Sequence, residues 1–154
     1  MVVGGRWLAL VAGAVLVLSG CGKKEEGTPA GGGSASPSVT PSEATTPLSN
    51  GEVAAFHGLQ DVSGKASVEL ELDDFYFGPT VLVGKGGQSL KLELFNEGSN
   101  AHTFTLKAQG VDQTVDPGKT AEVAVTFPQS GSATFACTFH GVSNNMRGDL
   151  RTAN

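Results

Sequence analysis

The residues best suited to chemistry lie near the C-terminus of this 154-residue chain. Cys137, His140 and Met146 follow one another as C-x2-H-x5-M, although the whole sequence holds only two cysteines, three histidines and two methionines. A thiolate, an imidazole and a thioether are donors that favour copper over calcium or magnesium. The spacing therefore predicts most of a copper site.

A fourth donor, His102, lies upstream at the start of a predicted strand. Apolar and polar residues alternate through residues 102–106 and 133–137, which is the pattern of half-buried strands. By this alternation His102 and Cys137 both fall on the inward face, together with the phenylalanines of their strands. Each donor also lies at one end of its strand, so we expect both to point toward the core near one end of the fold.

The elements that position these donors are predicted to be strands throughout. The two-residue period recurs in five segments, which are 68–72, 90–94, 102–106, 121–127 and 133–137. Turns rich in Gly, Pro and Asn separate them, and no convincing helical period is present. Half-buried antiparallel strands at this spacing indicate an all-β fold, a Greek-key β-sandwich or barrel.

The N-terminus has the pattern of an export signal. Arg6 precedes a twelve-residue apolar run, 7–18, that is too short to span a bilayer comfortably. "LSGC" then resembles the bacterial lipobox, which implies a signal peptide over residues 1–20, cleavage before Cys21 and lipid such as palmitate on Cys21. The alternative is an ordinary signal or anchor with an accidental cysteine. A lipidated Cys21 leaves Cys137 without a disulfide partner, which is unusual in an exported protein.

Residues 21–65 are predicted to be a flexible linker that precedes a folded domain at 66–154. The stretch 22–50 has almost no large apolar residues and consists mainly of Gly, Ser, Thr, Ala and Pro, so it cannot bury enough surface to order itself. Such a tether could be a leash between partners or only a spacer that clears the cell envelope. Three apolar residues just after it, Val53, Phe56 and Leu59, could dock on the domain.

Charge argues against nucleic acid as a partner, because the formal net charge is -5. From residue 66 on, ten acidic residues face six basic ones, and they could steer a basic partner or simply keep the surface soluble. Asp73 and Asp74 are interpreted as solvated charges at a sheet edge. No hydrolytic constellation and no phosphate-binding loop is visible in the sequence.

Three fragments, taken in order, resemble the cupredoxins, the blue copper proteins of the plastocyanin and amicyanin type. They are "DDFYFGPTVLVGKGGQSLKLELFNEGSNAHTFTL", "DPGKTAEVAVTF" and "FACTFHGVSNNMRGDL". The resemblance covers about residues 67–150. It implies a cupredoxin fold with one type 1 copper ion, held by His102, Cys137 and His140 with Met146 as a weak axial ligand.

The resemblance also implies roles for residues around the ligands. The backbone N–H of Thr103 would donate a hydrogen bond to the thiolate sulfur, and Asn96 and Thr138 would pin the two ligand loops together. In the family the second histidine often reaches the surface inside an apolar patch where electrons leave. Here Gly141 and Val142 would flank it.

The chain departs from the family between His140 and Met146. Five residues, "GVSNN", separate them, whereas plastocyanins have four and amicyanins two. The longer loop could place Met146 farther from the metal, or leave the axial position to a backbone oxygen or solvent.

These observations together predict a one-electron carrier that is not an enzyme. We expect a monomer, lipid-anchored through Cys21 on the outer face of the membrane, that exchanges electrons with a cytochrome, an oxidase or a reductase in the envelope. Two alternatives stay open: a copper-binding lipoprotein for copper delivery or resistance, and a metal-free β-sandwich module for adhesion or assembly.

Overall fold

The computed structural model describes residues 44–153. The predicted signal peptide, Cys21 and the linker up to residue 43 lie outside the described residues. Within 44–153 the chain forms strands joined by turns and one short 3-10 turn, η1 (Lys107–Gln109). This part contains no helix long and apolar enough to cross a membrane.

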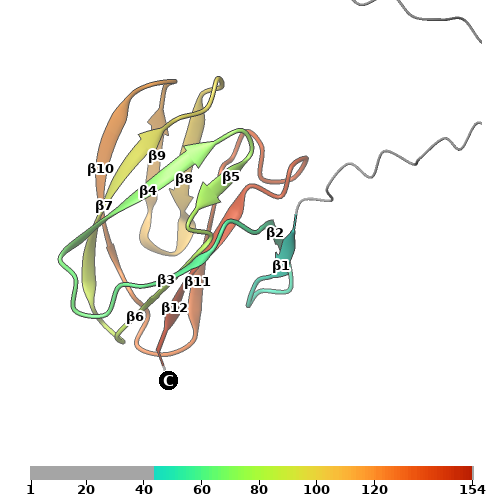
Figure 1. The fold of residues 1–154 in the computed structure, drawn as a ribbon. Coiled ribbons are helices and arrows are strands. Elements are labelled where there is room, and N and C mark those ends of the chain that lie inside the picture. Colours follow the sequence, from blue (N-terminus) through green and yellow to red (C-terminus); the bar gives the residue numbers. More distant parts are fainter. Residues whose placement is uncertain (1–43, 154) are drawn as a thin grey trace, which may run out of the picture. The chain divides into compact units, whose positions relative to one another are not determined.

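Two sheets form the body of the domain (Figure 1). The four-stranded sheet has the order β10 (Thr120–Thr126), β7 (Ser89–Asn96), β4 (Ser67–Asp73), β5 (Tyr76–Gly78). The six-stranded sheet has the order β3 (Leu59–Asp61), β6 (Val81–Gly84), β12 (Arg147–Thr152), β11 (Ser132–Ala136), β8 (His102–Leu106), β9 (Val111–Val115). The prediction of an all-β sandwich is confirmed.

All five predicted strands exist, as β4, β7, β8, β10 and β11. The expectation of antiparallel pairing is wrong in part, because β4 and β7 run parallel, with Leu70 opposite Leu94. Two further parallel pairs join β6 to β3 and to β12. Alternation of residue types reports which face is buried but carries no information about strand direction, and this explains the error.

The core lies between the two sheets and is built from the inward residues of the predicted alternation. Leucines of β4 and β7 face phenylalanines of the other sheet, and all are fully buried. The rings of Phe104 and Phe135 lie 5.0 Å apart, and Phe77 meets Phe135 edge-on at 5.0 Å. Aromatic pairs at this separation add to the stability that burial supplies, and they fix β8 against β11 just beneath the predicted ligands.

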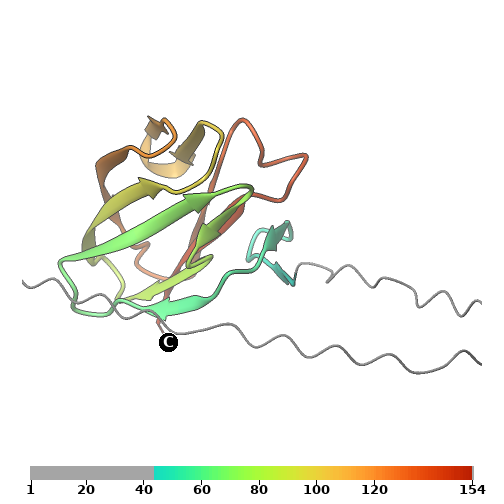
Figure 2. The ribbon, with the colours of Figure 1, turned by 45° about the horizontal axis from the view of Figure 1, so that its top comes forward.

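The predicted domain boundary at residue 66 is too late. The strand β3 already belongs to the six-stranded sheet, and before it β1 (Thr45–Pro47) pairs with β2 (Val53–Ala55) to form a hairpin. Figures 1 and 2 show this hairpin beside the loop that precedes β12. It docks through buried Leu48, Ala54 and Ala55, whereas Val53, Phe56 and Leu59, the three apolar residues that could have docked, are all at least 37% exposed.

Hydrogen bonds compensate for the small apolar contact of this hairpin. The carboxylate of Asp149 in β12 is fully buried and accepts hydrogen bonds from the backbone and hydroxyl of Ser49, from the hydroxyl of Thr134 and from Arg151. A segment that buries only one large apolar side chain, Leu48, can order in this way, because its donors meet a buried acceptor. Composition alone could not reveal that acceptor one hundred residues away.

Candidate metal centre

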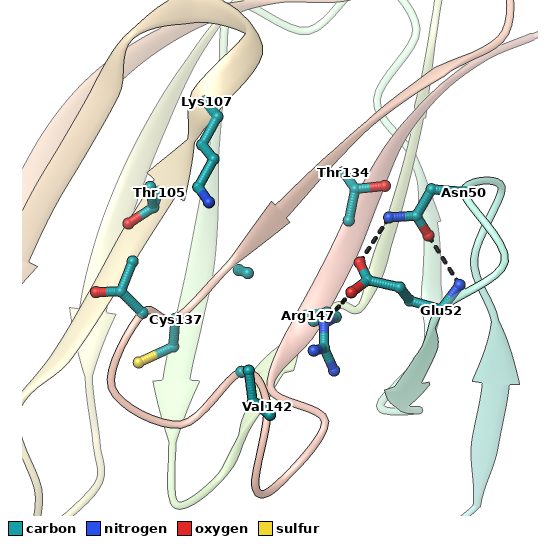
Figure 3. Close-up of a pocket in the computed structure, with 11 residues that line it drawn as sticks. Asn50, Glu52, Thr105, Lys107, Thr134, Cys137, Val142 and Arg147 are labelled. Atoms are coloured by element: carbon teal, nitrogen blue, oxygen red, sulfur yellow. Dashed lines mark hydrogen bonds and ion pairs between the residues drawn. The ribbon is translucent and has the colours of Figure 1, made fainter.

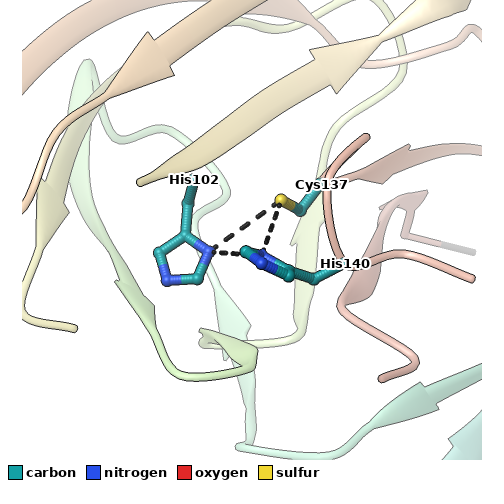
Figure 4. Close-up of side chains that lie close together, drawn as sticks. All are labelled: His102, Cys137 and His140. Atoms are coloured by element: carbon teal, nitrogen blue, oxygen red, sulfur yellow. Dashed lines mark hydrogen bonds between the residues drawn. The ribbon is translucent and has the colours of Figure 1, made fainter. Parts of the chain in front are cut away.

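Two segments far apart in the sequence bring three of the four predicted donors together, His102, Cys137 and His140 (Figure 4). His102 begins β8, and Cys137 directly follows β11. The turn after Cys137 is tight, since the Gly141 N–H donates to the Cys137 carbonyl over 2.7 Å. A Cβ at Gly141 would come 2.5 Å from that carbonyl oxygen, so this turn requires glycine. The turn carries His140 back over the end of the sheet.

The donor atoms of His102, Cys137 and His140 all face one point. The Nδ1 atoms of the two histidines are 3.1 Å apart, and the cysteine Sγ lies 3.9 Å from the first and 3.5 Å from the second. His102 and Cys137 are buried, whereas His140 is half-buried. Histidine, cysteine, aspartate and glutamate side chains can all bind metal ions. Among the described residues, His102, Cys137 and His140 form the one group of such side chains close enough together to hold an ion.

Asp74 sets the orientation of His102. The Nε2 of His102 lies 3.0 Å from the Asp74 carboxylate, and since a carboxylate only accepts, Nε2 carries the proton. The Nδ1 lone pair of His102 therefore faces His140 and Cys137. A carboxylate behind a histidine in this way fixes the tautomer and the orientation of the ring.

Asp74 is held by the loop that leads into β8. Its carboxylate accepts backbone hydrogen bonds from Ser99 and Asn100. The bond from the Ser99 N–H is the main cause that lowers the pKa of Asp74 to about 2, despite an opposing effect of burial. The interpretation of Asp74 as a solvated edge charge is therefore wrong, because this carboxylate is ionised, multiply bonded and directed at His102.

Gly98 makes this arrangement possible. A Cβ at position 98 would come 2.5 Å from the Asp74 carboxylate oxygen and 3.1 Å from the Nε2 of His102. Any side chain there would push apart the two groups that must hydrogen-bond. The glycine of the "NEGSN" turn thus serves the centre as well as the turn, which the sequence pattern did not indicate.

Around the sulfur, one predicted contact is present. The Thr103 N–H donates to the Cys137 Sγ over 3.4 Å. The Thr103 hydroxyl accepts from the Thr138 N–H at 2.8 Å and lies 3.0 Å from the Thr138 hydroxyl, so these two threonines join the ligand segments. The N–H donor and the two joined threonines hold the sulfur in a fixed position between the ligand segments.

Asn96 was expected to join the two ligand segments, but it does not. Its side-chain amide donates to the carbonyls of Asn100 and Val115 at 2.8 Å each, and its carbonyl oxygen accepts from the Gly98 N–H. Asn96 therefore shapes the loop before His102, and through Gly98 and Asn100 it supports the position of Asp74.

His140 is half-buried, and its surroundings lower its pKa. Burial lowers its pKa, the neighbouring His102 lowers it further, and Asp74 opposes both effects. A lowered pKa keeps the imidazole neutral near neutral pH, which is the form that binds metals. The ring of Phe75 covers one side of His140, with ring centres 4.7 Å apart. Phe75 follows Asp74 directly, so one short turn supports both histidines.

Met146 is fully buried at the end of the same loop. Its carbonyl accepts a hydrogen bond from the Cys137 N–H at 3.0 Å, which fixes the backbone of Met146 beside that of the cysteine. His57, the remaining histidine, lies outside the cluster and stacks on Tyr76 with ring centres 3.3 Å apart.

Replacing Asp74 by asparagine should weaken metal binding. Asp74→Asn removes the charge that orients His102, and loss of such a partner typically lowers metal affinity by about 10- to 100-fold. Competition against a metal-binding dye measures the effect. Asp73→Asn is the matched control, since Asp73 bonds Tyr76 and the Asp74 backbone but not a histidine. Equal affinity in Asp74→Asn and the unaltered chain would contradict the role given to Asp74.

The comparison with protein families identifies a match. The model of the cupredoxin-like domain matches residues 51–150, which is most of the described part of the chain. Its limits include the second strand of the hairpin and β3, in agreement with a domain that begins before residue 66. The comparison with curated proteins found no match.

The comparison with solved structures found matches at low sequence identity. The metal-binding domain of the Cu(I)-exporting P-type ATPase CopA of Streptococcus pneumoniae D39 is 9% identical, with a TM-score of 0.51, over 64% of this chain and 99% of that domain. Auracyanin B is 18% identical, with a TM-score of 0.49, over 57% of this chain and 88% of that one. Auracyanin A of Chloroflexus aurantiacus is 18% identical, with a TM-score of 0.45, over 62% and 100%.

Proposed function

The chain belongs to the cupredoxin-like family, and on this premise we propose that it binds one copper ion as a type 1 site and carries single electrons. The observation that supports this most strongly is the convergence of two imidazole nitrogens and one cysteine sulfur within 4.8 Å of one another. His102, Cys137 and His140 are the proposed ligands.

The spacing of the donors fits a metal ion bound by all three. Bonds of about 2.3 Å to sulfur and about 2.0 Å to nitrogen, the lengths known from zinc sites, would separate the donors of a three-coordinate ion by about 3.5–3.8 Å. The observed separations of 3.1, 3.5 and 3.9 Å bracket these values. A His2Cys set with a weak axial thioether is the donor set of blue copper centres, whereas structural zinc usually takes more thiolates.

A bound copper ion would supply the one-electron Cu(I)/Cu(II) couple, and the chain would supply a fixed frame. Asp74 holds the ring of His102, the Thr103 N–H holds the sulfur, and the two threonine hydroxyls join the segments that carry the ligands. A frame that need not rearrange when an electron moves keeps the cost of transfer low.

The surface around His140 supports it as the place where electrons enter and leave. Phe139 is 56% exposed and Val142 is 89% exposed, and they lie on either side of this ligand in the chain. Gly141, which was expected to share the surface, is buried, and the sequence reasoning did not single out Phe139. An exposed apolar pair beside a ligand suits brief docking of a redox protein.

The cellular setting remains part of the proposal. We propose that lipid on Cys21 anchors the chain, as a monomer, to the outer face of the membrane. Its partners there would be a membrane or envelope cytochrome, oxidase or reductase. Labelling cells with a palmitate analogue tests the anchor: the unaltered chain should be labelled and Cys21→Ser should not.

Met146→Leu should leave copper bound and raise the reduction potential, because loss of a weak axial donor destabilises Cu(II) more than Cu(I). Protein-film voltammetry measures the shift. Ser143→Ala, an exposed change in the same loop, is the control and should leave the potential unchanged. An unchanged potential in Met146→Leu would rule out the thioether as axial ligand and leave the axial position to a backbone oxygen or solvent.

The experiment that tests the carrier function is voltammetry of the copper-loaded protein combined with a copper-transfer assay. A carrier gives a reversible one-electron couple and keeps its copper when mixed with a Cu(I) chelator of moderate strength. Rapid loss of Cu(I) to the chelator without a reversible couple would favour copper delivery. A protein that takes up no copper would leave only the metal-free module.

A further inference from the structure

The N-terminal hairpin, residues 44–57, lies against the segment that carries Met146 (Figures 1 and 2). We propose that this hairpin is a clamp that positions Met146 relative to the other ligands, and that Glu52 and Ala55 are its positioning residues. The inference rests on the proposed copper site. The hairpin would determine where the axial ligand lies. Met146 follows "GVSNN", the stretch in which the chain departs from the family pattern.

The first contact of the clamp is a backbone hydrogen bond. The Ala55 N–H donates to the carbonyl of Asn145 over 3.0 Å. The same carbonyl accepts from the Arg147 N–H over 2.8 Å, so it holds the chain on both sides of Met146. Asn145 has a φ of 56°, in the left-handed region that asparagine adopts more readily than most residues other than glycine. The Ala55 N–H bonds the carbonyl of this turn residue and so ties the turn to the hairpin.

The second contact is a chain of polar side chains, and Figure 3 shows its first three members, Asn50, Glu52 and Arg147. The carboxylate of Glu52 lies 3.3 Å from the Nε of Arg147, whose side chain is only 12% exposed. Asn50 fixes Glu52 by bonding both its carboxylate, at 2.6 Å, and its N–H, at 3.0 Å. Arg147 in turn reaches the side-chain oxygen of Asn145 at 3.5 Å. The residues on either side of Met146 are thus both tied to the hairpin.

A third contact makes the clamp rigid. Ser49 at the hairpin turn bonds the buried Asp149, two residues beyond Arg147 on β12. The hairpin residues Leu48, Ala54 and Ala55 are themselves buried. The hairpin also lines one side of a pocket of about 350 Å3 whose other side is formed by Thr105, Lys107 and residues of the ligand loop. It is therefore seated on the domain beside the loop.

A weak axial ligand should respond to such a clamp more than a strong one. The thiolate and the imidazoles bond tightly and set their own distances, whereas the bond to an axial thioether is long and weak, so the protein decides where the sulfur lies. In this chain the ligand loop is long, and Val142 in its middle is 89% exposed. The hairpin holds the end of the loop from which Met146 extends.

Glu52→Ala and Ala55→Pro in the full chain test the clamp. The first breaks the ion pair to Arg147 and the second removes the N–H that Asn145 accepts. Both should still bind one copper ion, yet show a changed ratio of the two thiolate-to-copper absorption bands and a shifted reduction potential. Glu52→Gln keeps a hydrogen-bond acceptor and should restore much of the original spectrum. Glu69→Ala, an exposed carboxylate on β4, is the matched control and should change neither.

Hydrogen exchange of the metal-free protein tests the same contact without copper. The amide of Cys137, which donates to the Met146 carbonyl, should exchange about fivefold faster in Glu52→Ala, as loss of one hydrogen bond implies. Spectra of both variants that superimpose on the unaltered protein would overturn the clamp while leaving the copper site intact. If the unaltered protein bound no copper, the proposed function would fail, and unchanged exchange would then overturn the clamp separately.

Discussion

Cys137→Ser is expected to abolish the intense visible band of the copper-loaded protein and to lower its copper affinity by at least about 100-fold. The band arises from charge transfer between the thiolate and Cu(II), and a serine hydroxyl offers neither a soft donor nor an easily ionised one. The Thr103 N–H would then face a neutral hydroxyl in place of the sulfur it now meets at 3.4 Å. Visible spectra and dye competition measure the two effects.

The neighbouring residue provides a matched control for this substitution. Ala136 is the last residue of β11 and is half-buried. Because side chains alternate along a strand, it lies on the opposite face from Cys137. Ala136→Ser adds the same hydroxyl one position away and should keep the full band. A Cys137→Ser protein that retained the band would show that the sulfur is not a ligand.

The second large effect concerns stability and falls on Asp149. Asp149→Ala should lower the free energy of unfolding by about 3 kcal/mol, because it leaves hydrogen-bond donors without the buried carboxylate that satisfied them. The hydroxyls of Ser49 and Thr134 and the guanidinium of Arg151 would lose their partner. Urea unfolding followed by fluorescence measures the change. Asp112→Ala, which removes an exposed carboxylate with one hydrogen bond from Thr105, should cost much less.

This stabilisation should depend on pH in a defined direction. Burial raises the pKa of Asp149, but the hydrogen bonds from Ser49 and Thr134 and the neighbouring Arg151 outweigh burial, so the net shift is downward. A carboxyl whose pKa is lower in the folded state stabilises the fold above its unfolded value of about 3.9. The difference between the unaltered chain and Asp149→Ala should therefore be full at neutral pH and shrink as the pH falls through the folded pKa. A difference that grows toward acid pH would contradict this account.

The sequence predicted the strands and the donor set well because both leave local signals. Alternation placed His102 and Cys137 on inward faces, and the structure buries both. The scarcity of Cys, His and Met made their clustering conspicuous. The resemblance to the cupredoxins added the Thr103 contact to the sulfur, which depends only on the residue after His102.

The rest could not be predicted because it depends on packing between distant segments. Asp74 reaches His102 only because the turn after β4 meets the loop before β8. Asn96 braces that loop and does not reach the other ligand segment, a choice that side-chain geometry makes. The hairpin is ordered by Asp149, whose sequence neighbours give no sign that it is a buried acceptor.

The most direct test of the copper site is a titration of the metal-free full chain with Cu(II), followed by visible absorption. We expect an intense thiolate-to-copper band that grows linearly and saturates at one equivalent of copper. A protein that stays colourless throughout, or that binds Cu(II) with only weak absorption and no thiolate band, would contradict it.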